Sequence, residues 1–361
     1  MSPNNTTLHE VARLAGVSVS TVSRVLTPER RHLVNDETAK RVEEAIQTVR
    51  YSPNSLARGL KTRRSLTVGV LIPDLRNPVF PPMLRGIEER LARDDYTPLI
   101  VNTDNDPARE HRAFEKLQAR QVDGFILATT IRNDEVIDRA IAVGAPVVLL
   151  NRTVSDGRVH AVVPNDRHGM RLAVEHLVEL GHTAIGHVAG PSSTSSGQRR
   201  REGFRAAMRR HGLAAPRPFV QQAAAFTAPA GREAARKLLD GGKPLTAIVA
   251  GNDLLALGCY DALQERGLRC PDDVSIVGFN NMPFADRFNP PLTTLYFPHE
   301  ELGRIAAQLL VGRLGPDPAA QTPREVMVEP SLVIRGSTAP LESNGRRPSR
   351  DRRNGRQRPR R

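Results

Sequence analysis

The sequence is poor in cysteine, with only Cys259 and Cys270 among 361 residues. Neither has a histidine or another cysteine at the spacing of a zinc site, so we expect no disulfide framework and no bound metal. Scarce cysteine also fits a reducing compartment. The longest apolar runs, residues 68–72 and 145–150, are too short to cross a bilayer, and the first residues lack the apolar stretch of a signal peptide. These absences predict a cytoplasmic protein without membrane contact.

Common catalytic motifs are also missing. The sequence has no Gly-x-Ser-x-Gly elbow, no Walker phosphate loop, no His-Glu-x-x-His and no Gly-x-Gly-x-x-Gly. His176, His182 and His187 lie close in sequence, but their spacings of six and five do not form a metal-binding face. We therefore expect structural histidines, no cofactor and no enzyme activity.

Positive charge is concentrated at the two ends of the chain. The formal net charge is +13, of which residues 1–64 carry +5, residues 337–361 carry +7 and the residues between them +1. A basic segment of domain-like composition at one end is typical of a protein that binds an acidic polymer, usually nucleic acid.

The first 64 residues have the pattern of three short helices. Thr7 and Glu10 form a capping box at the first, which ends at Gly16, and Ser18 can cap a second helix that runs through Leu26. A third helix begins near Asn35. The residues expected on the buried faces are Val11, Leu14, Ala15, Val22, Val25, Leu26, Val42, Ala45, Ile46 and Val49. Two short helices joined by a tight glycine turn predict a helix-turn-helix.

From Leu66 onward, apolar runs of strand length alternate with amphipathic helical stretches. The expected strands are 66–73, 99–103, 122–128, 146–151, 184–189, 247–250 and 274–279, and the expected helices include 82–93, 111–119, 169–180 and 232–239. This alternation predicts parallel sheets covered on both faces, and the units are numerous enough for two Rossmann-like lobes. The Arg-rich residues 337–361 have too little apolar content to fold and are expected to be disordered.

Residues 7–26, TLHEVARLAGVSVSTVSRVL, resemble the DNA-binding headpiece of the lactose/galactose repressor (LacI/GalR) family. The resemblance covers about residues 6–336. Further matching motifs follow in collinear order: YSPN at 51–54, ARGL at 57–60, VGV at 68–70, VDG at 122–124, GND at 251–253, VGF at 277–279 and PLTT at 291–294. An ordered set of this kind is more specific than a lone helix-turn-helix.

The resemblance implies an all-α headpiece (residues 1–52), a hinge helix (53–64) and a two-lobed α/β sensor (65–336) built like a periplasmic sugar-binding protein. The lobes implied by the family are an N-lobe of 65–163 with 293–322 and a C-lobe of 164–290 with 323–336. It also implies a transcriptional regulator, a repressor, that binds a pseudo-palindromic double-stranded DNA operator as a homodimer. A small-molecule effector in an interlobe cleft would control that binding allosterically.

The family pattern places the second helix in the major groove. There Arg24 can contact guanine bidentately, Ser20 can donate or accept, and Val19 can contact a thymine methyl or pack at the helix start. In the hinge, Leu60 matches an apolar wedge that parts a base step, the alternative being a packed linker residue. Several hydroxyl side chains in the set can either contact DNA phosphates or cap a helix. The full set expected at DNA is Thr7, Ser18, Val19, Ser20, Thr21, Ser23, Arg24, Asn54, Ala57, Arg58 and Leu60.

Seven residues match the family's effector cleft: Asn77, Phe80, Asn151, Arg152, Phe226, Asn252 and Asn280. All but Phe226 lie at or just past the carboxyl ends of expected strands, where open parallel sheets bind ligands. Amides, a guanidinium and two aromatic rings suit a sugar, a sugar acid or another small carboxylate. Asn77 is alternatively a turn residue, and both phenylalanines are alternatively core residues.

Two departures from the family affect the expected ligand. Asn151 and Asn280 stand where sugar-sensing members often have aspartates, which favours an acid held by Arg152 over a neutral sugar. Aspartates at Asp74, Asp166 or Asp253 would reverse this preference if they point inward. In addition, a family arginine ahead of the Gly-Phe pair at 203–204 aligns with Gln198, with Arg199 one position away, which leaves that contact in doubt.

Two other function classes remain to be separated from a regulator. An enzyme would need a motif that the sequence lacks, and a transporter's solute-binding protein would share the sensor but have no use for a headpiece. For assembly, residues 337–361 contain only Ala339, Leu341 and prolines as apolar content. They cannot form the apolar heptad seam of tetrameric relatives, so we expect a dimer.

Overall fold

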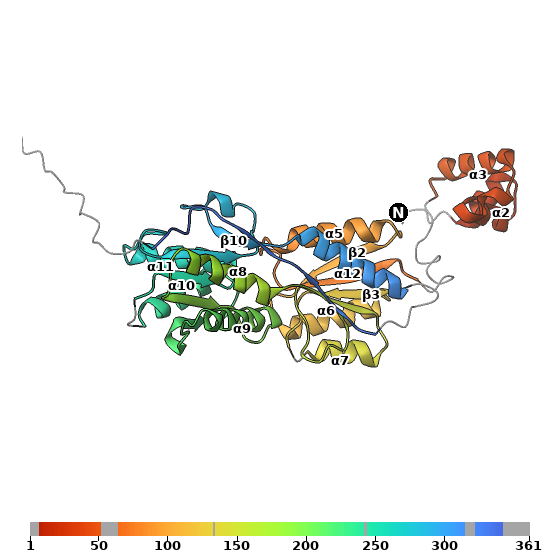
Figure 1. The fold of residues 1–361 in the computed structure, drawn as a ribbon. Coiled ribbons are helices and arrows are strands. Elements are labelled where there is room, and N and C mark those ends of the chain that lie inside the picture. Colours follow the sequence, from red (N-terminus) through yellow and green to blue (C-terminus); the bar gives the residue numbers. More distant parts are fainter. Residues whose placement is uncertain (1–6, 52–63, 133, 242–243, 315–321, 342–361) are drawn as a thin grey trace, which may run out of the picture. The chain divides into compact units, whose positions relative to one another are not determined.

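The computed structural model describes residues 7–51, 64–132, 134–241, 244–314 and 322–341. The chain divides into two compact units, Met1–Ser65 and Leu66–Arg361, and each is described by itself (Figure 1). None of the helices in these ranges is long and apolar enough to span a membrane.

The first unit consists of α1 (Leu8–Ala15), α2 (Val19–Val25), a 3₁₀ helix η1 (Pro28–Leu33) and α3 (Asp36–Thr48). Gly16 adopts a left-handed conformation, with φ of 64°, that ends α1 and turns the chain into α2. Val11, Val22 and Val42, one from each α-helix, are fully buried in a shared core. The predicted helix-turn-helix is confirmed.

Several details of this unit correct the prediction. The Thr7 side chain makes no capping hydrogen bond, so the expected capping box does not form. Leu14 is exposed, because the buried face of α1 is centred on Val11, Ala12 and Ala15 and leaves position 14 at its edge. Other apolar residues expected inside are only partly buried: Val25, Leu26, Ile46 and Val49.

The second unit contains two six-stranded sheets, one in each lobe. The N-lobe sheet is parallel throughout, in the order β11-β5-β4-β3-β1-β2. Its strands are β1 (Thr67–Ile72), β2 (Thr97–Asn102), β3 (Gly124–Leu127), β4 (Val147–Leu150), β5 (His160–Pro164) and β11 (Glu325–Val328). Helices α5 (Phe80–Ala92) and α12 (His299–Leu314) pack together, as do α6 (Pro107–Ala119) and α7 (Glu135–Ala142). The two helix pairs contribute to separate buried clusters.

The C-lobe sheet has the order β12-β10-β9-β8-β6-β7, parallel except for the antiparallel pairing of β12 with β10. Its strands are β6 (Ile185–Ala189), β7 (Val220–Gln222), β8 (Ala247–Ala250), β9 (Ser275–Phe279), β10 (Thr293–Tyr296) and β12 (Ser331–Val333). Its helices are α8 (Asp166–Glu179), α9 (Ser195–Arg210), α10 (Ala228–Leu239) and α11 (Asp253–Glu265), with the 3₁₀ turns η2 (Arg217–Phe219) and η3 (Ala285–Arg287). Helices α8 and α9 pack together, as do α10 and α11. The seven expected strands are confirmed as β1, β2, β3, β4, β6, β8 and β9.

The predicted lobe boundaries near the carboxyl end of the chain are wrong. Strand β10 pairs with β9, with Thr294 opposite Gly278, and therefore belongs to the C-lobe. Strand β11 pairs with β5, with Val326 opposite Val162, and belongs to the N-lobe. The chain thus crosses between lobes from β10 to α12 and again from β11 to β12. The apolar pattern of a short strand does not specify its hydrogen-bonding partner, so sequence alone could not place these two strands.

The first residues of the expected disordered tail are also part of the C-lobe. The Ser337 hydroxyl is buried, accepts from the Thr293 amide at 2.8 Å and donates to the Ile276 carbonyl at 2.6 Å. The Leu341 amide donates to the Leu180 carbonyl at 2.8 Å. These hydrogen bonds anchor residues 337–341 although the segment has few apolar residues. A prediction based on apolar content does not count such hydrogen bonds and therefore missed them. Residues 342–361 lie outside the described ranges.

Candidate DNA-binding and effector sites

The start of α2 is organised by a hydroxyl cluster. Ser18 is the N-cap, and its Oγ accepts from the Thr21 amide at 3.2 Å, as predicted. The same oxygen lies 2.7 Å from Ser20 Oγ and 2.9 Å from Thr21 Oγ1. Three of the hydroxyls expected at DNA therefore already contact one another.

The other expected α2 residues differ in exposure. Arg24 is exposed and pairs with no carboxylate in the described part of the chain, whereas Ser23 is half-buried. Val19 is half-buried against the headpiece core, which agrees with a packing role. Less of its side chain is therefore accessible for contact with a DNA base. Thr7 is exposed, with no capping bond from its side chain. The hinge residues Asn54, Ala57, Arg58 and Leu60 lie outside the described ranges.

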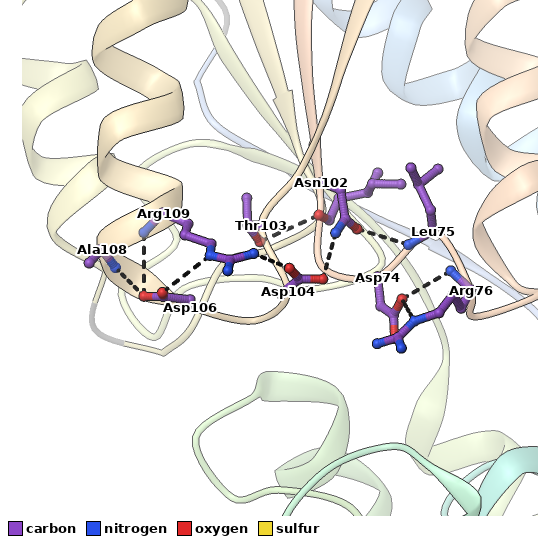
Figure 2. Close-up of polar contacts among 10 residues, drawn as sticks. Asp74, Leu75, Arg76, Asn102, Thr103, Asp104, Asp106, Ala108 and Arg109 are labelled. Carbon is purple, nitrogen blue, oxygen red and sulfur yellow. Dashed lines mark hydrogen bonds and ion pairs between the residues drawn. The ribbon is translucent and has the colours of Figure 1, made fainter.

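In the sensor, the loops that follow β1 and β2 form a polar network (Figure 2). Asn102, at the end of β2, accepts from the Leu75 amide at 2.9 Å and donates to Asp104 at 2.6 Å. Arg76 pairs with Asp74 at 3.0 Å, and Arg109 pairs with Asp104. Arg76 and Arg109 are therefore both paired within the N-lobe. Sequence reasoning did not select Asn102, although its place at a strand end was a usable signal.

The two effector candidates after β1 fit their alternative roles. The Asn77 side chain accepts from the Val79 amide at 3.3 Å within the turn that leads into α5. Phe80, the first residue of α5, is 2% exposed and belongs to the hydrophobic core. Each of these residues therefore already performs a structural task.

The segment after β4 carries Asn151 and Arg152. Asn151 has φ of 61°, and its buried Oδ1 has no hydrogen-bond partner in the part of the chain that the structure describes. Arg152 is buried, and its Nη1 donates to the Thr129 carbonyl at 2.8 Å while Nη2 donates to Asn105 Oδ1 at 3.3 Å. Burial lowers the pKa of Arg152 to about 10, opposed by the carboxylates of Glu110 and Asp134. Arg152 is thus a buried cation with carboxylates near it.

The C-lobe edge holds the remaining candidates. Asn252 is buried at the N-cap of α11 and accepts from the Leu255 amide at 2.9 Å. Asn280 follows β9 and is buried, with φ of 117°. Phe226 is half-buried and lies against Gly190, where a β-carbon would come within 2.3 Å of the ring. All three lie near the ends of C-lobe strands.

Arg200 is the residue that sequence reasoning missed. It is 3% exposed, donates from Nε to Asp166 at 2.7 Å and from Nη1 to the Gly251 carbonyl at 2.7 Å, and covers the Phe279 ring. The expected position, Gln198, instead bonds Glu202 on the same helix, at 2.7 Å. Two positions along a helix turn a side chain by about 200°, so the misalignment selected the wrong face of α9.

Two further aspartates lie buried at this edge. Asp166 forms the ion pair with Arg200, and Asp253 accepts from Thr294 Oγ1 at 2.5 Å and from the Met282 amide at 2.7 Å. Burial raises the pKa of Asp253 to about 6, opposed by these hydrogen bonds. These are two of the three aspartates that would reverse the predicted preference for an acidic effector if they faced the ligand, and both lie buried at this edge.

The carboxyl edges of the two sheets meet. The Thr153 amide, after β4, donates to Ser195 Oγ at the start of α9 at 2.9 Å. The Arg132 amide, after β3, donates to the Ser193 carbonyl at 3.0 Å. The fold therefore brings the Asn151–Arg152 segment and the N-terminal end of α9 together. Within the described ranges, no group of three or more His, Cys, Asp or Glu side chains is placed to hold a metal.

Comparison with known proteins assigns the chain. Residues 7–54 match the family described as bacterial regulatory proteins, lacI family, and residues 174–338 match a periplasmic binding protein-like domain. The ribose operon repressor of Escherichia coli (strain K12) is 35% identical over 334 residues, which are 92% of this chain and 99% of that protein. The chain belongs to the LacI family.

Solved LacI-family structures share the fold. The Lac repressor dimer bound to operator and the anti-inducer ONPF has a TM-score of 0.81 at 28% identity, covering 93% of this chain and 100% of that chain. A LacI family transcriptional regulator from Enterococcus faecium with bound ribose has a TM-score of 0.67 at 33% identity, covering 76% and 100%. This LacI-family chain is a transcriptional regulator that binds DNA through its headpiece under the control of an effector-binding sensor.

Proposed function

We propose that this LacI-family chain is a cytoplasmic homodimeric repressor, and not an enzyme, whose operator affinity changes when a small neutral sugar binds between the two sheet edges. The observation that carries the choice of ligand is the charge balance there. Arg200 is paired with Asp166, and the carboxylates of Glu110 and Asp134 are close enough to Arg152 to stabilise its positive charge. An anion would compete with these carboxylates, whereas a neutral ligand would not.

The polar groups left over at this edge suit hydroxyl groups. Arg200 Nη2 and Arg152 Nε make no hydrogen bond with any described residue and can donate. Asn151 Oδ1 and Thr130 Oγ1 are buried and have no hydrogen-bond partner among the described residues. A sugar hydroxyl both donates and accepts, so it can satisfy groups of both kinds, and the Phe226 ring offers an apolar face. The ribose operon repressor as a relative and the ribose-bound neighbour support a pentose as the first probe.

Exposed apolar surface supports the dimer. Phe284 is 75% exposed and has φ of 70°, a left-handed backbone that is costly for a bulky residue. Phenylalanine is enriched at the core of protein–protein interfaces, so an exposed ring at this position suits a surface that another protein covers. The Lac repressor neighbour is a dimer on its operator, which supports a second copy of this chain as the covering partner.

Calorimetry with D-ribose and D-ribonate tests the ligand. We expect heat of binding with ribose and none with ribonate, and a gel shift on the DNA upstream of the protein's own gene that ribose alters. Tight ribonate binding together with indifference to ribose would refute the neutral effector. Loss of the gel shift after Arg24→Ala, with ribose binding intact, would separate the DNA-binding function from the sensor.

A further inference from the structure

Glu110 is a buried carboxylate without an evident structural task. It lies on α6, is 5% exposed and forms no ion pair with a cation in the described part of the chain. The other buried carboxylate nearby, Asp134, is the N-cap of α7 and accepts from the Ile131 and Val136 amides. Capping explains the burial of Asp134, but Glu110 caps nothing.

Within the described part of the chain, the Glu110 side chain makes one hydrogen bond, and it leads to the effector edge. Its Oε1 accepts from the Thr129 hydroxyl, and Thr129 follows β3. The carbonyl of the same threonine accepts from Arg152 Nη1 at 2.8 Å. One residue therefore links the buried carboxylate on one side to the buried guanidinium on the other. The second bond of Arg152, to Asn105, completes its orientation.

We propose that Glu110 is a positioning residue for effector recognition, which acts through Thr129 to hold Arg152 where its guanidinium meets the ligand. The inference rests on the proposed function, because Arg152 contacts an effector only there. Glu110 itself does not touch the ligand. With its carboxylate ionised, the Thr129 hydroxyl has a charged acceptor that fixes this residue, and Arg152 has a counter-charge behind it.

This arrangement makes effector binding depend on pH. Burial and the neighbouring Asp134 raise the pKa of Glu110 to about 7, opposed by the Thr129 hydrogen bond and by Arg152. The charged groups that face this cluster are Asp134 from α7 and Arg152 after β4, with Arg200 from α9 acting on Arg152. Below pH 7 the carboxyl becomes neutral, the acceptor for Thr129 weakens and Arg152 is held less firmly.

The experiment measures D-ribose affinity by calorimetry on the full chain from pH 6 to pH 8. We expect the wild type to bind about fivefold more weakly at pH 6 than at pH 8, a change worth roughly one ordinary hydrogen bond. Glu110→Gln, of nearly the same shape, should bind weakly at every pH, and so should Thr129→Val. Glu115→Gln makes the same change on the solvent-facing side of α6 and should behave like the wild type. A Glu110→Gln profile parallel to that of the wild type would overturn the proposal.

A ligand-free measurement separates this inference from the proposed function. The Nε–H resonance of Arg152, assigned by its loss in Arg152→Lys, should titrate with a midpoint near pH 7 in the wild type. It should stay constant in Glu110→Gln. If it titrates in this way while ribose does not bind, the proposed ligand is wrong and the positioning role stands. If it titrates in neither protein or equally in both, the positioning role is refuted.

Discussion

The guanidinium carbon of Arg200 lies 3.8 Å from the centre of the Phe279 ring. At this distance a planar cation stacks on the face of the ring, and the same guanidinium pairs with Asp166. The contact joins three elements of the C-lobe, since Arg200 comes from α9, Phe279 ends β9 and Asp166 begins α8. It therefore fixes the N-terminal ends of two helices against the edge of the sheet.

Removal of this arginine should destabilise the sensor strongly. Arg200→Met keeps much of the apolar volume but leaves Asp166 buried without its cation, so we expect a loss of about 3–5 kcal/mol in the free energy of unfolding. Urea unfolding of the full chain, followed by far-UV circular dichroism, measures it. Arg209→Met, exposed at the end of the same helix, should cost less than about 0.5 kcal/mol. Adding Asp166→Asn to Arg200→Met should recover part of the loss, and a further additive loss would contradict this account.

Two glycines of α12 should respond in opposite directions to alanine. A β-carbon at Gly303 would lie 2.0 Å from the Met83 carbonyl on α5, so Gly303→Ala must separate these helices and should cost about 3 kcal/mol or more. A β-carbon at Gly312 meets nothing within 4 Å, and Gly312→Ala should add about 1 kcal/mol through helix propensity. Thermal unfolding of both variants checks the pair. Equal effects would show that the close approach of α5 and α12 is not required.

The buried His187 should make the folded protein less stable in acid. Burial lowers its pKa to about 4, opposed by the bond to the Val249 carbonyl, and its ring stacks on Phe204. In the unfolded chain this histidine becomes protonated below about pH 6.5, whereas in the folded chain it stays neutral down to about pH 4. Protonation therefore favours the unfolded chain, and the free energy of unfolding falls as the pH drops from 6.5 to 4. In His187→Leu, the decrease in the free energy of unfolding between pH 7 and pH 4 should be about 3 kcal/mol smaller than in the wild type. The readout is the difference between variant and wild type in urea unfolding at pH 7 and at pH 4.

This difference isolates one histidine, because the other groups that titrate in acid are the same in both proteins. His211→Gln changes an exposed histidine and serves as the matched control. If His187→Leu loses as much stability in acid as the wild type, burial does not lower the pKa of His187 in the folded protein.

Arg24 should supply base discrimination. Arg24→Ala is expected to weaken binding to the specific operator by about 1–3 kcal/mol and binding to random DNA much less. Fluorescence anisotropy at fixed salt measures both. Lys40→Ala removes the same charge from the exposed face of α3 and should affect both DNAs alike. An equal loss on both DNAs for Arg24→Ala would leave only a phosphate contact at this position.

Phe284 should contribute to the dimer. Phe284→Asn removes the ring and suits the left-handed backbone, so we expect the dissociation constant of the dimer to rise about tenfold or more without loss of monomer stability. Sedimentation equilibrium measures the change. Met327→Ser removes another exposed apolar side chain, on β11, and serves as the matched control. An unchanged constant for Phe284→Asn would move the dimer surface elsewhere.

Local patterns predicted much of this fold correctly. Gly16 and Ser18 identified the turn between α1 and α2, because a left-handed glycine and a hydroxyl N-cap act on adjacent backbone groups. Long apolar strands such as β1 and β9 were found because burial on both faces leaves a continuous apolar run. The strands that were missed are β5, β7, β10, β11 and β12. Of these, β7, β11 and β12 lie at sheet edges and have no fully buried residue, so they lack a continuous apolar run.

The candidate site was only partly predictable, for a geometric reason. The sequence located strand ends, and Asn151, Arg152, Asn252 and Asn280 indeed lie there. It did not identify Arg200, since an error of two positions on a helix points the side chain to the opposite face. Nor did it show that Asp166 neutralises Arg200, a relationship between side chains 34 positions apart.

By itself, the sequence determined that this is a basic headpiece followed by a two-lobed α/β sensor, because helix caps, apolar periodicity and collinear motifs are properties of neighbouring residues. The tertiary structure alone decided which lobe holds β10 and β11, that Ser337 is anchored inside the C-lobe, and that the buried Arg200 pairs with Asp166. Strand pairing and charge compensation depend on distances between residues far apart in the chain. Those distances are set by packing, which no local pattern records.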